Sequence, residues 1–315
     1  MLLKFKQKFS IVPVIPLTKC WNVFILNQLK NMPAHFQKSL HELGIQFYSG
    51  RHLLNKNIMV TKKNQQPYLT TPPLDLFRSR IGNFVPLIIG STTGEFAGSA
   101  IAAEELAQKG NNSGYDKLNN EWEELAPIYV GYERGTPKSR YISRELRKFY
   151  LNDEPVGLGR YQGLANLWAD TLHFQAHFYD RLMATYSCQP IYHYLFGYQG
   201  CESWSKWSNG TIFGVGHQDE LLLLFKVGQF PEVCDRDIKT LERLTGIVES
   251  FAKTGRPIPA DNHDYSNVNW ETTTKDDPKY LKIDEELSMV NGIIYEDRMN
   301  KWDELFPLPS IKITN

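Results

Sequence analysis

Short apolar runs alternate with longer amphipathic stretches along the chain from Tyr68 onward. The run FVPLIIG (84–90) is apolar and closes with a glycine, which predicts a strand buried on both faces of a parallel sheet. The run PIYHYLFGY (190–198) is rich in aromatic and β-branched residues and predicts a second strand. Stretches with helical periodicity separate and follow the two runs, and this alternation is typical of an α/β fold.

Five stretches carry the pattern expected of helices. The segment 162–187 has a stripe of aromatic and aliphatic side chains, and 237–255 is amphipathic and should end at Gly255, before Pro257. The predicted helices are a turn running into a helix at 91–108, then 142–151, 162–187, 237–255 and 297–306.

The predicted sheet is incomplete. A parallel strand buried on both faces needs a neighbour on each side, and an open apolar edge invites aggregation. Two strands are therefore too few, and we expect residues 67–315 to hold only part of a sheet. Residues 1–66 mix Lys and Asn with short apolar pieces and form an unassigned segment that resembles nothing recognised.

The composition excludes several classes of partner. The 315 residues are 42% hydrophobic, and 35 basic residues balance 35 acidic ones, so the footprint of a nucleic-acid binder or a polybasic membrane binder is missing. No apolar run approaches the roughly 18 residues of a membrane span. Residues 1–20 make a poor signal peptide because Lys and Pro interrupt them. Localisation stays open between secreted and cytoplasmic, as does glycosylation at the triplets beginning with Asn111 and Asn209.

The cysteines and histidines do not predict a metal site. No C-x-x-C pair is present, so neither a zinc site of the usual spacing nor a disulfide-dense scaffold is expected, and one bridge between Cys188 and Cys201 is a hypothesis. His173 and His177 have a metal-ligand spacing, yet the glutamate of H-E-x-x-H is absent and no third ligand is evident. We expect no metal and no cofactor. The four cysteines are Cys20, Cys188, Cys201 and Cys234.

Glu95 is the first candidate for chemistry. It follows the predicted strand by five residues, in the kind of loop where α/β enzymes carry functional side chains. The local pattern favours another interpretation, because Thr92-x-x-Glu95 also fits a capping box at the start of the next helix.

His217 is the second candidate. It follows the second predicted strand and stands beside Gly214 and Gly216, which permit sharp turns. Alone, such a histidine is more often structural. An acid after one strand and a histidine after the next is, however, the chain order acid…His of α/β-hydrolases, in which the acid orients the imidazole and the imidazole deprotonates a serine.

Several motifs together resemble the carboxylesterase type B family, the cholinesterase-like branch of the α/β-hydrolases, and most of all the insect esterases. VPLIIGSTTGEF resembles the family's acid-bearing strand and turn, and GVGHQDELLLLF resembles its G-x-x-H-G-D-E-L-x-x-L-F motif. FAKTGRPIP, VNWETTTKDDPKYLKI and RMNKWDELF resemble later family motifs in the same order. The likeness covers about residues 68–306. It implies the C-terminal portion of an α/β-hydrolase fold, with an incomplete central sheet and helices on both faces.

By this resemblance Glu95 would be the acid of a catalytic triad and His217 its base. The sequence departs from the family at three positions directly beside Glu95 or His217. Gly94 replaces an acidic residue, Phe96 replaces a glycine and Gln218 replaces another glycine. We expect Phe96 to adopt the glycine's backbone poorly and to tilt the carboxylate.

The nucleophile of the family is absent from the sequence. No serine here has glycine at both −2 and +2, as the G-x-S-x-G elbow requires, and residues 1–66 hold no glycine-rich oxyanion loop. The sequence therefore predicts part of a serine carboxylesterase that in its complete form hydrolyses small apolar carboxylic esters. Two alternatives stay open: a non-catalytic cholinesterase-like binding or adhesion protein, and a truncated inactive product. The oligomeric state is not predicted.

One further feature has two interpretations. The aromatic side chains of the long helix either line an acyl or alcohol pocket or pack in the core, and core packing is the favoured interpretation. These residues are Trp168, Phe174, Phe178 and Tyr179.

Overall fold

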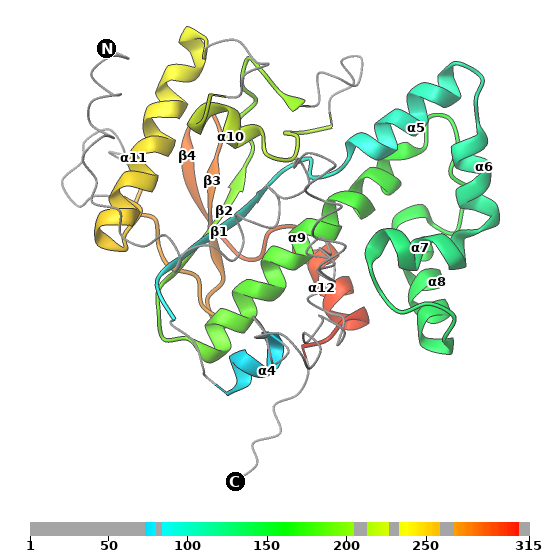
Figure 1. Cartoon of the computed structure of the whole chain (residues 1–315), viewed down its shortest axis with the longest axis horizontal. Helices are drawn as coiled ribbons and strands as arrows, with labels where there is room; N and C mark the ends of the chain where they lie inside the picture. Colours follow the sequence, from blue (N-terminus) through cyan, green and yellow to red (C-terminus); the bar gives the residue numbers. More distant parts are fainter. Residues whose placement is uncertain (1–72, 80–83, 205–212, 227–232, 259–267, 309–315) are drawn as a thin grey trace, which may run out of the picture. The chain divides into compact units, whose positions relative to one another are not determined.

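A four-stranded mixed sheet forms the centre of the computed structural model, which describes residues 73–79, 84–204, 213–226, 233–258 and 268–308. All of them belong to one compact unit, residues 51–315. The strand order is β1-β2-β3-β4, with β1, β2 and β3 parallel and β4 antiparallel to β3 (Figure 1). The segment 1–66 and its predicted boundary, like Asn209, lie outside the described residues.

The described elements include all those predicted from the sequence and several that were not. Their order is α4 (Pro73–Arg78), β1 (Leu87–Thr92), α5 (Gly98–Gln108), α6 (Ser113–Asn120), α7 (Trp122–Val130), α8 (Pro137–Leu151), α9 (Tyr161–Tyr186), β2 (Ile191–Phe196), α10 (Asp219–Leu224), the 3-10 turn η6 (Asp235–Asp237), α11 (Ile238–Thr254), β3 (Lys279–Ile283), β4 (Leu287–Asn291) and α12 (Glu296–Leu305). All five predicted helices and both predicted strands are present, and α11 ends at Gly255 in the left-handed conformation, φ 74°.

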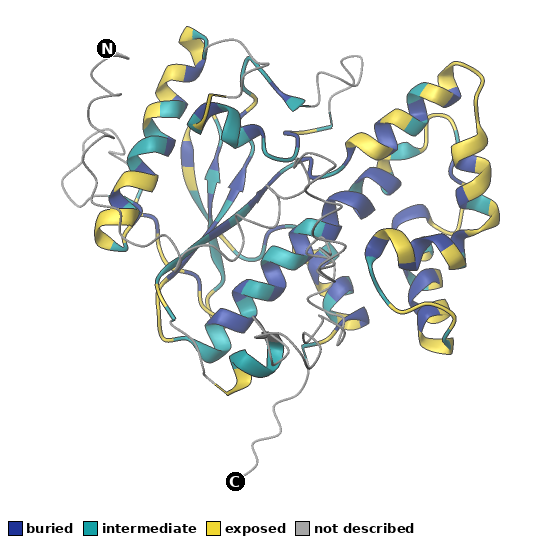
Figure 2. Cartoon of the chain, viewed as in Figure 1, coloured by how far each residue is buried: buried dark blue, intermediate teal, exposed yellow. Residues whose placement is uncertain are grey.

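Helices cover both faces of the sheet (Figures 1 and 2). The alternation along β2 shows this directly. Ile191 packs with Met183 of α9 on one face, whereas the ring of Tyr192 contacts that of Phe251 of α11 on the other. The expected α/β class with helices on both faces is therefore confirmed. A second core joins α5–α9 and α12, away from the sheet.

The prediction that β1 ends at Gly90 is wrong, because the strand continues to Thr92. Gly90 lies opposite Tyr194 in the parallel register. A Cβ atom at Gly90 would lie 2.4 Å from the Tyr194 ring, so the glycine makes room for that ring and does not terminate the strand.

The long helix uses its aromatic stripe for packing, as favoured above. Trp168, Phe174 and Phe178 are buried in the helical core. The ring centroid of Phe174 lies 5.1 Å from that of Trp302 on α12. Through such contacts α9 packs against β1, β2 and α12 and connects the sheet to the helical core.

Candidate active site

The acid turn, residues 92–96, starts at the carboxyl end of β1. The backbone N–H of Thr92 donates to Glu95 Oε1 over 2.9 Å, and the N–H of Thr93 donates to the carbonyl of Phe196 at the end of β2 over 3.0 Å. The first of these bonds is half of the predicted capping box. Thr92 is nevertheless the last residue of a strand, and α5 begins only at Gly98, so the helix-cap interpretation of Glu95 is wrong.

The His217 loop, residues 213–219, follows β2 and lies against the acid turn. The N–H of Gly94 donates to the carbonyl of Val215 over 2.8 Å, and the N–H of Val215 donates to Thr93 Oγ1 over 2.9 Å. A Cβ atom at Gly94 would lie 2.2 Å from the carbonyl oxygen of Phe213. Gly94 therefore permits the close approach of the two segments, which explains why an acidic side chain cannot stand there.

This approach brings Glu95 and His217 together. Glu95 Oε2 lies 2.5 Å from His217 Nδ1, with the Glu95 side chain 6% and the His217 side chain 23% exposed. Because the carboxylate accepts at Nδ1, that nitrogen carries the proton and Nε2 is the one able to accept another. The structure thus joins both candidates predicted from the sequence.

The pKa of Glu95 is lowered from its ordinary value, although burial by itself raises it. The hydrogen bond to His217, the charge of that ring and the bond from Thr92 N–H outweigh the burial. Glu95 is therefore a carboxylate at neutral pH, which is the form that orients and stabilises a protonated imidazole.

A second buried carboxylate, Asp219, holds the His217 loop. It accepts hydrogen bonds from the N–H of Gly216 (2.8 Å), the hydroxyl of Ser203 (2.5 Å) and the N–H of Trp204 (2.8 Å). Burial raises its pKa, and these three bonds act against that rise. Sequence reasoning missed both Asp219 and Ser203, and the only available clue was an acid two residues after the candidate histidine.

Phe96 and Gln218 keep a glycine-like backbone without being glycine. Phe96 has φ 50° and Gln218 has φ 70°, both in the left-handed region. The expectation that Phe96 would disturb the carboxylate is wrong, because Glu95 still bonds to His217 and the Phe96 ring packs against the imidazole with centroids 4.5 Å apart. The backbone strain at the two positions costs about 1 kcal/mol each.

Replacing Gln218 by Gly should therefore raise the free energy of unfolding by up to about 1 kcal/mol, because the strain relieved exceeds the entropy that glycine adds to the unfolded chain. Urea unfolding of the full chain measures it. The matched control is Gln189→Gly, at an exposed position outside the positive-φ region, which should lower stability instead. Equal losses in the two variants would show that Gln218 is unstrained.

Glu220, the next residue of α10, is a half-buried acid with an unusual charge state. Its Oε2 is buried without a hydrogen-bond partner among the described residues. Burial, followed by the charges of Glu95 and Asp219, raises its pKa to about 8. At neutral pH Glu220 is therefore mostly a neutral acid beside the Glu95 carboxylate.

Glu220→Gln should consequently be more stable than the wild type at alkaline pH. The folded pKa is about 8 and the ordinary one is 4.5, so the wild type loses stability as pH rises between these values, whereas the amide does not titrate. The advantage should be complete above about pH 8 and vanish below 4.5. Urea unfolding across this range measures it, with the exposed Glu242→Gln as control. A difference independent of pH would contradict the burial of the charge.

The two histidines of α9 do not converge on a metal. His173 Nδ1 lies 3.0 Å from Asp170 Oδ1, whereas His177 Nε2 lies 3.0 Å from Asp303 Oδ2. Each ring is thus engaged by its own carboxylate. The expectation that no metal and no cofactor is needed stays a prediction.

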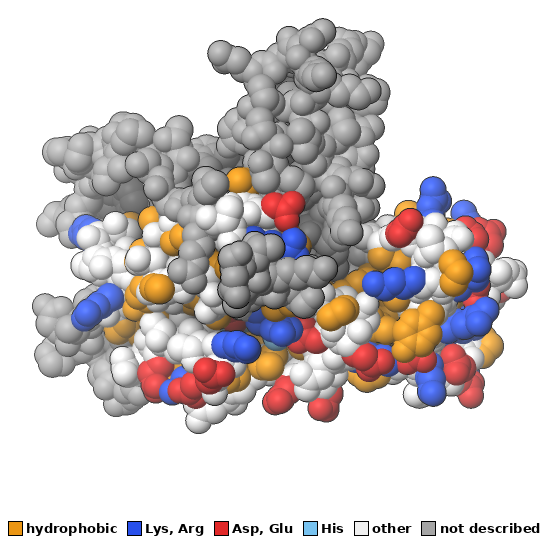
Figure 3. Space-filling model, turned by 90° about the horizontal axis from the view of Figure 1, so that it is seen from below, with side chains coloured by type: hydrophobic (Ala, Val, Ile, Leu, Met, Phe, Trp, Pro, Cys, Tyr) orange, Lys and Arg blue, Asp and Glu red, His pale blue; other side chains and the backbone are white. Residues whose placement is uncertain are grey.

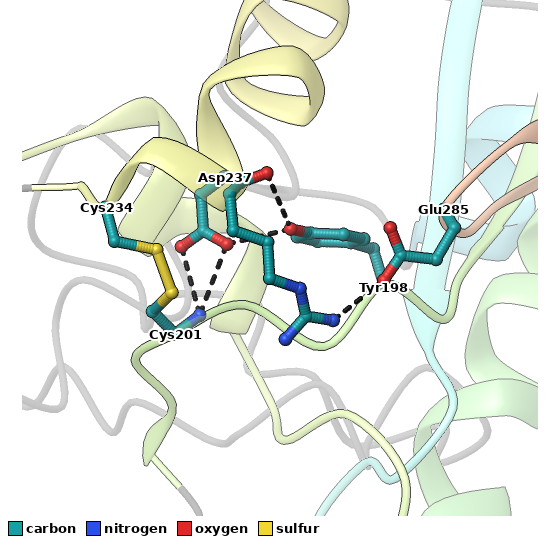
Figure 4. The surroundings of a disulfide bond; sticks show 6 residues. Tyr198, Cys201, Cys234, Asp237 and Glu285 are labelled. Carbon is teal, nitrogen blue, oxygen red and sulfur yellow. Dashed lines mark hydrogen bonds and ion pairs between the residues drawn. A yellow bond between two sulfur atoms is a disulfide. The ribbon is translucent and has the colours of Figure 1, made fainter.

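The hypothesis of a Cys188–Cys201 bridge is wrong. Cys201 pairs with Cys234 (Figure 4). Cys188 is free and exposed. Cys188 precedes β2 and Cys201 follows it, so the strand separates them by about 20 Å, well beyond the reach of a disulfide. Asp237 accepts from Tyr198 OH (2.8 Å) and from the N–H of Cys201 (3.0 Å), which fixes the bridge to the start of α11.

Within the described ranges, one group has ligand atoms close enough for a metal ion, and it contains this bridge. The atoms of Cys201, Cys234 and Asp237 lie within 4.8 Å of one another. Both sulfurs are consumed by the disulfide, so the group does not offer the thiolates that a metal would need.

Comparison with known proteins places these features in a family. A sequence model described as "Carboxylesterase family" matches residues 32–302. The chain belongs to the carboxylesterase family. The match begins at residue 32, well before the motifs that carry the resemblance, and it contains both Glu95 and His217.

Individual carboxylesterases resemble the chain over part of their length. A carboxylic ester hydrolase of Bombus ignitus is 25% identical over 229 residues, covering 70% of this chain and 39% of the relative. A juvenile hormone esterase of Tribolium castaneum is 26% identical over 246 residues, covering 71% of this chain and 40% of the relative. The chain thus spans about two-fifths of the length of these carboxylesterases.

The fold agrees with that of a solved carboxylesterase. The crystal structure of the juvenile hormone esterase of Manduca sexta, with OTFP covalently attached, superposes with a TM-score of 0.63 at 20% identity. The superposition covers 97% of this chain and 55% of the esterase, which confirms the partial α/β-hydrolase fold. In the described residues, no helix combines the length and apolar character of a membrane-spanning segment.

The surface shows charges of both signs. In the view of Figure 3, Lys and Arg side chains alternate with Asp and Glu over the described part of that face. Exposed ion pairs such as Arg144–Glu123 (2.7 Å) and Arg160–Glu154 (2.7 Å) belong to this mixed surface. That nucleic acid is not a partner remains a prediction from composition.

Proposed function

We propose that this chain is the acid-and-base portion of a serine carboxylesterase, whose complete form hydrolyses small apolar carboxylic esters. The observation that carries the proposal is the 2.5 Å contact between Glu95 Oε2 and His217 Nδ1. An oriented histidine with its second nitrogen available is the arrangement that activates a hydroxyl nucleophile.

Each residue has a distinct role in the reaction. A serine outside this sequence attacks the ester carbonyl carbon while His217 Nε2 takes the hydroxyl proton. His217 then returns that proton to the alcohol oxygen as the carbon–oxygen bond breaks. In the second half of the cycle His217 takes a proton from water, whose oxygen attacks the acyl carbon. It then gives that proton to the serine oxygen as the acyl–serine bond breaks and the carboxylic acid leaves. Glu95 keeps the ring oriented and stabilises its cation throughout.

Two further observations support the proposal. Phe96 and Gln218 keep the left-handed backbone that suits the family's glycines, so the substitutions leave the pair intact. Among the described residues β1 pairs on one side only, with β2, which is consistent with a sheet that continues in a longer protein. The alternative hypothesis, a non-catalytic binding protein, does not explain why a buried carboxylate is hydrogen-bonded to an imidazole.

The proposal is tested first on the native transcript, read upstream of the codon for Tyr68. We expect an in-frame G-x-S-x-G, preceded by a glycine-rich segment for the oxyanion hole. The encoded protein should then hydrolyse p-nitrophenyl butyrate. A reading frame without the serine elbow, or an intact protein that binds such esters without turning them over, would contradict the esterase and favour the binding protein.

A further inference from the structure

A second pair of buried polar side chains reaches the acid turn from α9. The side chains of His173 and Asp170 are 1% and 0% exposed. His173 Nε2 lies 2.8 Å from the carbonyl oxygen of Thr92, at the start of the acid turn, and His173 Nδ1 lies 3.0 Å from Asp170 Oδ1. The contact with Thr92 joins residues 81 positions apart in the sequence.

The two partners of His173 lie on opposite sides of its ring. A backbone carbonyl can only accept a hydrogen bond, so the bond to the Thr92 carbonyl requires His173 Nε2 to carry the proton and to donate. The other ring nitrogen, Nδ1, faces the Asp170 carboxylate, which in turn is paired with Arg298 Nε at 3.2 Å. The ring is therefore held on both sides, with its donor aimed at the acid turn.

The Asp170 carboxylate is itself held by several neighbours. Asp170 Oδ2 also accepts from Tyr150 OH over 2.5 Å, and Tyr150 in turn accepts from Trp302 Nε1 over 2.6 Å. The centroid of the Tyr295 ring lies 3.8 Å from the Arg298 guanidinium carbon and 4.8 Å from the centroid of the His173 ring. These contacts fix Asp170, Arg298 and His173 relative to one another.

The carbonyl bonded to His173 belongs to the peptide unit between Thr92 and Thr93, and both the C=O and the N–H of this unit are hydrogen-bonded. Its oxygen, on Thr92, accepts from His173, and its N–H, on Thr93, donates to Phe196. The preceding N–H, also of Thr92, holds Glu95 Oε1. Any movement of Thr92 would therefore move the carboxylate that orients His217.

We propose that His173 is a positioning residue for the Glu95–His217 pair: held at Nδ1 by Asp170, it donates from Nε2 to the Thr92 carbonyl and so fixes the acid turn. This inference rests on the proposed function, because it assumes that the pair is the acid and base of the esterase. The charge of His173 also contributes to the lowering of the Glu95 pKa, which favours the same state of the pair.

The test uses nuclear magnetic resonance of the full chain with ¹⁵N-labelled histidine, at neutral pH, and needs no turnover. In the wild type we expect Nε2 of His173 to be protonated and hydrogen-bonded, and His217 to show a low-field Nδ1 proton that is lost in Glu95→Gln. In His173→Ala that low-field signal should be lost or shifted upfield. In His173→Gln, whose side-chain amide can donate to the Thr92 carbonyl, it should be partly restored.

The chain offers a matched control in His177→Ala. His177 lies one turn further along α9, is buried, and bonds to a carboxylate at the same distance, 3.0 Å. It makes no contact with the acid turn among the described bonds, so its loss should destabilise α9 while leaving the His217 signal unchanged. A purely structural role for His173 predicts the same result for both variants.

Each outcome decides one of the two ideas. An unprotonated Nε2 of His173 in the wild type, or a His217 signal that survives equally in the two alanine variants, would overturn the positioning role. If His173→Ala does not fold, the ring nitrogens of the wild type and the His173→Gln spectrum still decide. A wild type without any Glu95-dependent His217 proton would instead refute the pairing on which the proposed function depends.

Discussion

His217→Ala in the complete esterase is expected to lower kcat/KM by at least about 10⁴-fold, with little change in the binding of the ester. In the proposed mechanism, the imidazole bonded to Glu95 at 2.5 Å takes and returns the nucleophile's proton. Without it the serine hydroxyl attacks in its protonated form, and the remaining binding and oxyanion contacts give only residual catalysis. Initial rates with p-nitrophenyl butyrate measure the loss.

A second variant at the pair and a control variant elsewhere on α9 test the same assignment. Glu95→Gln should lose about 10³- to 10⁴-fold, because an amide neither enforces the Nδ1-protonated tautomer nor stabilises the imidazolium. His177→Ala removes a buried histidine of α9 that is bonded to Asp303, away from the pair, and should keep activity within about threefold. If His217→Ala kept more than a tenth of the wild-type rate, the assignment of the base would be wrong.

Gly94→Ala is expected to lower the free energy of unfolding by about 3 kcal/mol or more. The added Cβ would lie 2.2 Å from the carbonyl oxygen of Phe213 and 2.9 Å from that of Val215, and both are backbone atoms that cannot rotate away. Relief requires the His217 loop to separate from the acid turn, which also breaks the bond from Gly94 N–H to Val215. Urea unfolding of the full chain measures the loss.

The control lies four residues further on. Gly98 opens α5, and a Cβ there would meet nothing within 4 Å. Gly98→Ala should therefore be neutral or stabilise the chain by up to about 1 kcal/mol, because alanine costs less entropy in a helix. Similar effects of the two alanines would mean that the acid turn and the loop are not in close contact.

The strands show which parts of the fold were predictable from local pattern. β1 and β2 lie between helices on both faces of the sheet. Their sequences are therefore apolar runs, and this pattern predicts both strands. β3 and β4 were not predicted, because β3 carries Lys279 and Lys282 and its antiparallel partner ends the sheet. Lys279 pairs with Glu271 at 2.6 Å and Lys282 with Asp284 at 3.0 Å, so these charges are satisfied locally and conceal the strand.

The residues of the site also divide into those that local sequence motifs predict and those that they do not. Glu95 and His217 were predicted because the motifs around them resemble those of carboxylesterases, whereas the local pattern alone favoured a helix cap and a structural histidine. The groups that hold them were not predicted, because Asp219 depends on Ser203, and His173 on the Thr92 carbonyl, through contacts between distant positions. Gly94 appeared to be a departure from an acidic residue. Its reason, a backbone only 2.2 Å from where a Cβ would stand, exists only in three dimensions.

The bridge between Cys201 and Cys234 spans 33 positions, and His217 lies between its ends. The segment that carries His217 is therefore a covalently closed ring attached to the sheet at one side and to α11 at the other. A protease that hydrolysed one peptide bond inside this ring would leave a nick, and both new ends would remain tethered to the molecule. His217 would therefore stay covalently attached to the rest of the chain after such a cut.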